Sequence, residues 1–153
     1  MGIRRTIMHE LRTEIEIAAP KAKVWRILTD FDHWKEWNPI VNHASGVASI
    51  GSKLSFTMRG KDCKDSAKYS PIVTKLEEPK FLRWHAVMIA GFLFTNDKVF
   101  ELEETNSGTR LIHRELFSGM LVPIFCSKLN QGVIPMLQSM NVALKKLAEK
   151  SSN

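Results

Sequence analysis

The sequence predicts an α+β fold, in which a curved antiparallel sheet of seven strands wraps around one long C-terminal helix and two short helices close one end. Three observations predict it. A strand and two short helical segments come first, within residues 11–37. Short alternating runs broken by glycine and proline follow, which is typical of antiparallel strands joined by turns. An amphipathic helical repeat then fills residues 122–150.

The first elements are a strand and the two short helices. Residues 11–17 alternate apolar with charged side chains, which is typical of a strand buried on one face. Pro20 suits the start of a helix over 21–29. A shorter helix is expected over 31–37, and Pro39 ends it because the residue before a proline avoids helical geometry.

Six further strands are expected after Pro39. Their predicted ranges are 41–45, 52–59, 66–77, 81–89, 96–104 and 109–117. One face of these strands is apolar and the other is polar, so the sheet is expected to be covered on one side only. The covering element is the helix over 122–150, and Pro135 within it is expected to bend it over the sheet.

Several motifs resemble those of a known family, and they occur in the family's order. They are Trp34 with Trp37-Asn38-Pro39, Leu82-Arg83-Trp84, and the segments 98–103, 108–119 and 140–145. The chain resembles, over roughly residues 9–150, the bacterial polyketide cyclase/dehydrase and lipid transport-like proteins of the START-related SRPBCC superfamily. This resemblance implies the helix-grip fold, in β-α-α-β6-α order, with a ligand cavity of several hundred Å³ as an order of magnitude. Superfamily members include carriers, receptors and cyclases, so the fold does not name a ligand.

One domain is expected over residues 9–150, with flexible ends at residues 1–8 and 151–153. A chain of 153 residues can bury about two thirds of the surface that its unfolded form exposes. No segment approaches the roughly 20 apolar residues that span a bilayer. The first ten residues do not resemble a secretion signal. We therefore expect a cytoplasmic protein without stable membrane insertion.

Charge and cysteine usage argue against several kinds of site. The net charge is +6, but the basic residues are scattered, which favours a solvated surface over a nucleic-acid site. Cys63 and Cys126 lie far apart in the sequence and are expected to be free thiols. The histidines are also scattered, so neither a metal nor another cofactor is expected. We expect a monomer or a weak homodimer.

The resemblance implies that the cavity is lined by the second short helix, the apolar sheet face and the long helix, with residues 31–39 as an aromatic lid. The expected lining residues are Trp34, Trp37, Leu54, Phe56, Met58, Trp84, Phe100, His113, Glu115, Phe117, Phe125, Val133, Met136, Leu137 and Met140. The alternative is a filled core, which the seven methionines and eight phenylalanines of the chain can supply.

His113 and Glu115 are the candidate ionisable groups of the cavity. The family pattern suggests that their face of the last strand looks inward, where two such groups about 7 Å apart can bind a hydroxyl or carbonyl group or move a proton. The alternative is that Ile112 and Leu116 form the core side, which leaves His113 and Glu115 solvated or simply hydrogen-bonded. Related proteins often carry histidine at the position of Lys98, so proton chemistry that needs that histidine is expected to be missing here.

The sequence thus predicts binding or transport of one small hydrophobic or amphipathic ligand, such as a lipid, fatty acid, polyketide or aromatic metabolite. Burial of apolar ligand atoms stabilises the complex, and His113 or Glu115 fixes the polar end. One alternative is an aromatase/cyclase enzyme in which these two residues promote aldol closure and dehydration. A second alternative is a co-chaperone-like interaction module. Other catalytic motifs are absent from the sequence, so a binding protein is favoured over an enzyme.

Overall fold

A computed structural model describes residues 8–150 of the chain. Residues 1–7 and 151–153, where flexible ends are predicted, lie outside the described residues, and Met8 is the first residue of a strand. In chain order the elements are β1 (Met8–Ile17), α1 (Lys21–Thr29), the 3-10 turn η1 (Phe31–His33), α2 (Trp34–Trp37), β2 (Val41–Ser45), β3 (Ser55–Arg59), the 3-10 turn η2 (Lys61–Cys63), β4 (Asp65–Tyr69), β5 (Ile72–Glu77), β6 (Phe81–Ile89), α3 (Ala90–Leu93), β7 (Phe94–Thr105), β8 (Gly108–Ser118) and α4 (Val122–Ala148).

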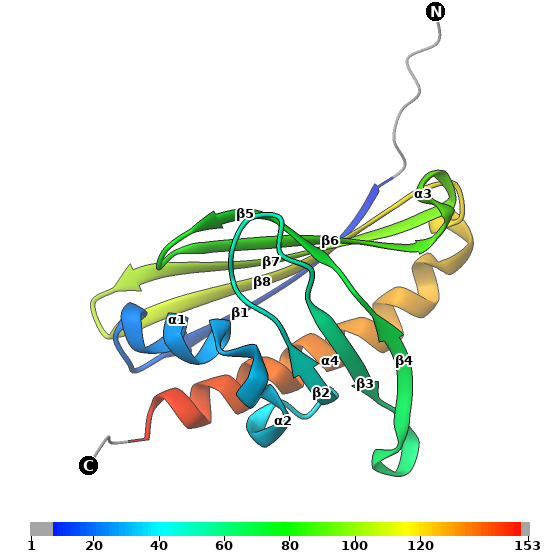
Figure 1. Cartoon of the computed structure of the whole chain (residues 1–153). Coiled ribbons are helices and arrows are strands. Elements are labelled where there is room, and N and C mark those ends of the chain that lie inside the picture. Colours follow the sequence, from blue (N-terminus) through cyan, green and yellow to red (C-terminus); the bar gives the residue numbers. More distant parts are fainter. Residues whose placement is uncertain (1–7, 151–153) are drawn as a thin grey trace, which may run out of the picture.

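The strands form two antiparallel sheets that curve around α4 (Figure 1). The larger sheet has the strand order β1-β8-β7-β6-β5, and the smaller has the order β2-β3-β4. A bridge between Lys53 and Ile72 joins them, and the Leu54 N–H donates to the Pro71 carbonyl oxygen at 2.8 Å. The predicted α+β class, with a curved antiparallel sheet and a long C-terminal helix, is confirmed.

The strand count differs from the prediction at one place. The segment 66–77, predicted as one strand, is divided into β4 and β5 around Pro71, so the described residues form eight strands instead of seven. Proline has no backbone N–H, and a strand that continued through it would lose a ladder hydrogen bond. β4 therefore pairs with β3, while β5 turns to pair with β6. This division lets the chain pass from one sheet to the other.

The helix α4 covers the concave face of the larger sheet, and Pro135 lies within it (Figure 1). Its second half is the better buried part, with Leu137, Met140, Leu144 and Ala148 each 1% exposed or less. These positions recur every three or four residues and form one helix face. In the described part of the chain, no helix combines the length and apolar character needed to cross a bilayer.

Two apolar clusters fill the space between sheet and helix. The aromatic end cluster lies under α1 and α2, and its rings are Phe31, Trp34, Phe56, Trp84 and Phe100. The second cluster lies toward the start of α4 and contains Leu11, Phe94, Phe117, Val122 and Leu137. Trp25 of α1, which is 6% exposed, belongs to the first cluster. The side chains that lie between the two clusters are polar.

Candidate functional site

Five polar side chains lie together between the concave face of the larger sheet and α4, and we call them the interior polar cluster: Thr13, Lys98, His113, Glu115 and Asn141. The strand register brings four of them into adjacent rows, because Glu115 is opposite Lys98 and His113 is opposite Thr13. Asn141 reaches them from α4. All five side chains are buried or nearly so. Buried polar groups of this kind need partners, since an unsatisfied group loses its hydration without compensation.

Three hydrogen bonds close a ring around His113. His113 Nδ1 lies 2.7 Å from Asn141 Oδ1, and Asn141 Nδ2 donates to Thr13 Oγ1 at 2.8 Å. The Thr13 hydroxyl in turn donates to the His113 carbonyl oxygen at 3.0 Å. Because the Asn141 amide donates to Thr13, its oxygen faces His113, and Nδ1 must carry the ring proton. The Nε2 atom of a neutral His113 therefore has a free lone pair.

The surroundings of His113 keep its ring neutral. The residue has no exposed surface, and its ring stacks on Phe100 with 4.4 Å between centroids. Burial, together with the positive charge of Lys98, holds the pKa of His113 well below its ordinary value. Within the described residues, Nε2 is buried and has no hydrogen-bond partner. His113 therefore presents an unoccupied acceptor inside the protein.

Lys98 and Glu115 form an ion pair beside His113. The Lys98 Nζ atom lies 3.1 Å from Glu115 Oε1, and the side chains are only 4% and 12% exposed. Tyr69 of β4 belongs to the same environment, because burial and the negative charge of Glu115 both raise its pKa, which keeps the phenol protonated. The site thus holds a cation, an anion, a neutral base and a phenol.

Two further side chains of the same sheet face carry buried donors without a partner. Among the described residues, Trp84 Nε1 and Asn96 Nδ2 make no hydrogen bond. Trp84 is opposite Lys98 in the register, and Asn96 is two residues before Lys98 on β7. A bound molecule with an oxygen acceptor can satisfy such donors. His113 Nε2 is a third such atom on this sheet face, and elsewhere in the described part of the chain Asn38 Nδ2, Thr105 Oγ1 and Arg114 Nε are also buried without a partner.

The structure distributes the predicted lining residues over both clusters. Those in or against the aromatic end cluster are Trp34, Trp37, Leu54, Phe56, Met58, Trp84, Phe100 and Met140. Those in or against the second cluster are Phe117, Phe125, Val133 and Leu137. His113 and Glu115 lie between the two, and Met136 on α4 is 38% exposed.

The space directly beneath the predicted aromatic lid is occupied by side chains. Trp34 of α2 lies 5.4 Å from Phe56 and 6.1 Å from Trp84 between ring centroids, and Phe56 lies 5.2 Å from Trp84. Rings at these separations are in contact. The cavity lined by the fifteen residues stays a prediction. His113 Nε2 lies deeper along the sheet, between the lid and the second cluster, whereas Asn38 Nδ2, which also has no partner among the described residues, belongs to the lid segment.

Sequence reasoning missed Thr13 and Asn141 as members of the site and treated Lys98 only as a departure from the family pattern. A signal for Asn141 exists, since it sits between Met140 and Leu144 in the buried repeat of α4. An amide on an apolar helix face indicates a polar partner inside. Thr13 gives a weaker signal, because threonine is common on the inner face of strands.

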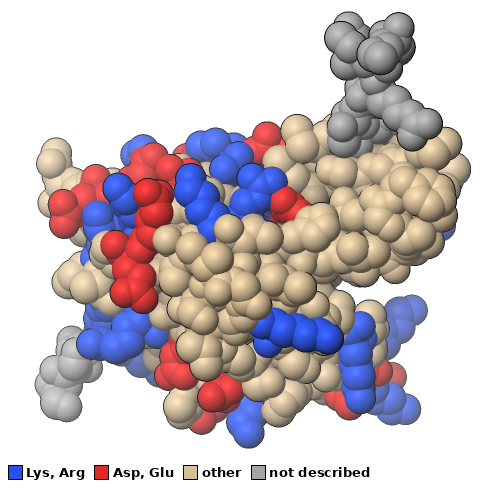
Figure 2. Space-filling view, turned by 45° about the horizontal axis from the view of Figure 1, so that its top comes forward, with Lys and Arg blue, Asp and Glu red and all other residues tan. Residues whose placement is uncertain are grey.

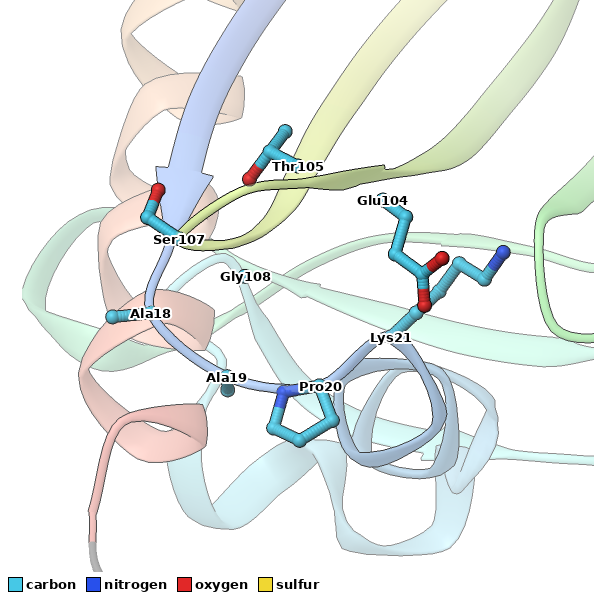
Figure 3. Close-up of a pocket in the computed structure, with 8 residues that line it drawn as sticks. All are labelled: Ala18, Ala19, Pro20, Lys21, Glu104, Thr105, Ser107 and Gly108. Atoms are coloured by element: carbon cyan, nitrogen blue, oxygen red, sulfur yellow. The ribbon is translucent and has the colours of Figure 1, made fainter.

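A surface pocket of about 400 Å³ lies elsewhere, where the β1–α1 connection meets the β7–β8 hairpin (Figure 3). Its lining residues are Ala18, Ala19, Pro20, Lys21, Glu104, Thr105, Ser107 and Gly108. It includes none of the predicted lining residues. Figure 3 shows the side chains of Lys21 and Glu104 on one side of it and Ala18 and Ser107 on the other. Half of these residues are exposed, so the pocket is open to water.

Comparison with known proteins gives one family match and several similar folds. The model of the family described as polyketide cyclase/dehydrase and lipid transport matches residues 8–150. No curated protein matches in sequence.

Three solved structures illustrate the similarity of fold. The di-domain ARO/CYC protein StfQ of the steffimycin biosynthetic pathway has a TM-score of 0.76 at 13% identity, over 93% of this chain and 51% of that one. The chain thus spans about half the length of StfQ. A protein from Nitrosomonas europaea has a TM-score of 0.71 at 21% identity, over 90% of this chain and 92% of that one. Norcoclaurine synthase from Thalictrum flavum has a TM-score of 0.73 at 12% identity, over 99% of this chain and 100% of that one.

Proposed function

Because this chain belongs to the polyketide cyclase/dehydrase and lipid transport family of the SRPBCC superfamily, we propose that its ligand is one small amphipathic molecule, whose polar end meets the interior polar cluster. The observation that carries this proposal is the buried ion pair of Lys98 and Glu115 beside the neutral His113, between two apolar clusters. Burying such groups costs free energy, and apolar side chains would fill the space at a lower cost. A ligand gives these groups a role.

The free hydrogen-bonding atoms specify the chemistry of the polar end. His113 Nε2 accepts a hydrogen bond, so it suits a hydroxyl group of the ligand. Trp84 Nε1 and the Lys98 ammonium donate, so they suit a carbonyl or carboxylate oxygen. A fatty acid or polyketide that carries both a hydroxyl and a carbonyl oxygen matches this pattern. Burial of its apolar part against the second cluster would contribute about 25 cal/mol per Å² of apolar surface removed from water.

A titration with matched ligands tests this proposal. Dodecanoate, 3-hydroxydodecanoate and dodecane are compared by isothermal calorimetry, with native mass spectrometry to establish one ligand per chain. We expect the hydroxy acid to bind best, by about fivefold to tenfold over dodecanoate, because it adds one hydrogen bond to His113. His113→Phe should remove this preference, and His33→Phe, at an exposed site, should keep it. Absence of saturable binding by both acids would overturn the proposal.

A second candidate function is a cyclase-type enzyme, and one specific observation favours it. The hydrogen-bond ring holds a lone pair on Nε2 of a neutral His113, close to the positive charge of Lys98. A base beside a fixed cation can remove a proton from a carbon next to a carbonyl while the cation stabilises the enolate oxygen. The enzyme proposal predicts that the protein accelerates deuterium exchange at the central carbon of a β-keto thioester, and that His113→Gln abolishes this acceleration while ligand binding persists. Unchanged exchange rates would leave only the binding function.

A further inference from the structure

Two connections form one end of the molecule, opposite α1 and α2 (Figure 1). The first links β6 to β7 through α3, and the second links β8 to α4. Hydrogen bonds hold them together, because the Met120 N–H donates to the Phe92 carbonyl at 3.2 Å and the Leu121 N–H donates to the Leu93 carbonyl at 3.0 Å. The two connections therefore act as one structural unit, and together with the end of β6 and the first turn of α4 they form what we call the apolar tip, residues 87–93 and 119–124.

Large apolar side chains on the tip point into solvent. Those at least 45% exposed are Val87, Met88, Ile89, Phe92, Met120 and Ile124. The sequence has no charged residue over 86–96 or over 116–127. In Figure 2 the end of the molecule that carries α3 is almost wholly tan, whereas most of the blue and red residues lie toward the opposite end and along the lower edge of the visible face. Soluble proteins rarely expose a continuous apolar surface unless it has a partner.

We propose that the apolar tip inserts into the surface of an anionic lipid bilayer. The hydrogen bonding of its backbone fits this environment, because polar backbone groups must be paired before they enter hydrocarbon. The carbonyls of Phe92 and Leu93 accept from the second connection, and the Phe94 N–H donates to the Ala90 carbonyl oxygen. Side chains projecting from the tip can enter the boundary between headgroups and acyl chains without any change of fold.

Charge favours an anionic bilayer over a neutral one. The chain has a net charge of +6. Lys128 follows Ile124 by four residues on α4, so both lie on the same exposed face of this helix. A lysine beside an inserted apolar group can contact the phosphate of an anionic headgroup. This docking is reversible and surface-bound, and it does not depend on the ligand proposed above.

The position of the tip relative to the interior strengthens the proposal. Phe94 and Val122, in the second apolar cluster, directly follow the two connections in the chain. Phe94 also stacks on Phe117 inside this cluster, with 5.6 Å between the ring centroids. A docked tip would therefore place the bilayer next to the apolar part of the interior, where an amphipathic molecule leaving the membrane could be received.

Vesicle co-sedimentation tests the docking directly. The wild-type chain is mixed with vesicles of phosphatidylcholine, alone or containing phosphatidylglycerol, and the bound fraction is measured. We expect binding to the anionic vesicles, with an affinity reduced by at least about tenfold in Phe92→Asp, because a carboxylate resists insertion into hydrocarbon. Ile50→Asp is the matched control, since Ile50 and Phe92 are both 67% exposed and Ile50 lies outside the tip. It should bind like the wild type.

Three results would overturn the proposal. The first is failure of the wild type to bind vesicles of either composition, and the second is a loss of binding in Ile50→Asp as large as that in Phe92→Asp. The third is a dimer in light scattering without lipid that Phe92→Asp converts to a monomer, which would assign the tip to a second copy of the chain. Circular dichroism of each variant ensures that loss of binding is compared between folded proteins. Lys128→Glu should weaken binding to anionic vesicles only.

Discussion

Lys98 and Glu115 face each other on β7 and β8 and pair inside the protein, with 3.1 Å between Nζ and Oε1. Removing one partner leaves the other charge buried and alone. Lys98→Met should therefore reduce the free energy of unfolding by about 3–5 kcal/mol, measured by urea denaturation near neutral pH. The double variant Lys98→Met, Glu115→Leu should lose much less, because apolar side chains of similar volume replace both charges.

An exposed ion pair provides the control for this comparison. The Arg12 Nη2 atom lies 2.5 Å from Glu14 Oε1, but the two side chains are 51% and 46% exposed. Arg12→Met should leave the free energy of unfolding almost unchanged, because water screens the exposed charges. If the double variant Lys98→Met, Glu115→Leu were as unstable as Lys98→Met alone, the result would contradict the expected cost of leaving one charge buried without its partner.

His113 should make the protein less stable as the solution becomes more acidic. Its folded-state pKa lies well below the ordinary value of 6.5 because of burial and Lys98, and the unfolded chain restores that ordinary value. Below about pH 6.5 the unfolded state therefore binds a proton that the folded state does not. The free energy of unfolding thus decreases as the pH is lowered, until the pH reaches the folded-state pKa of His113. The slope contributed by His113 is at most about 1.4 kcal/mol per pH unit. Urea denaturation between about pH 7 and 5.5 measures it, and His113→Gln should reduce it.

His33 is the matched comparison, because its shift has the opposite sign. His33 Nδ1–H donates a hydrogen bond to the exposed Asp30 carboxylate, which raises the pKa of His33, so its contribution to stability is present below pH 6.5 and is lost as the pH rises through the folded-state pKa. Both side chains are at least half exposed, so this contribution is small. His33→Gln should therefore leave the acid-side slope of the wild type intact. An equal slope in His113→Gln and the wild type would show that His113 titrates normally in the folded protein.

Asn141 should determine which nitrogen of His113 carries the proton. Its oxygen lies 2.7 Å from Nδ1, and its amide is held by Thr13. Nitrogen NMR of the wild type should report a protonated Nδ1 and a bare Nε2, whereas Asn141→Leu should give a mixture of both forms. The same variant should lose about 1–3 kcal/mol of stability, because it leaves buried groups without partners. A single unchanged form in Asn141→Leu would mean that the amide does not select it.

The sequence pattern predicts most elements of the fold because alternation and helical spacing are local signals. The helix over 21–29 and the strands over 41–45 and 81–89 lie where the pattern places them. The division of 66–77 is a long-range effect, since it depends on which strand each half pairs with after Pro71. A period-two pattern continues through such a bend without a change.

The interior polar cluster is harder to predict because it depends on strand register, and the apolar tip is harder to predict because its large apolar residues lie outside the core. Lys98 shares its strand face with Phe100, but only the pairing of β7 with β8 brings it to Glu115. Phe92 and Ile124 lie at the tip, although large apolar side chains ordinarily predict burial. Their exposure follows from the positions of two connections in space, which no local pattern contains.

Gly108 should be the least replaceable of two glycines that share a positive φ. It begins β8 at φ +147°, and a Cβ placed on it would lie 2.2 Å from the Ile17 carbonyl oxygen. Gly108→Ala must therefore shift the backbone where β1 and β8 meet, and we expect a loss of at least about 2–3 kcal/mol of stability. Gly51 has φ +85° but no atom within 4 Å of such a Cβ, so Gly51→Ala should lose only about 1 kcal/mol. Urea denaturation of both variants compares the two effects, and equal losses would mean that the positive φ alone, and not the close approach to Ile17, requires glycine at position 108.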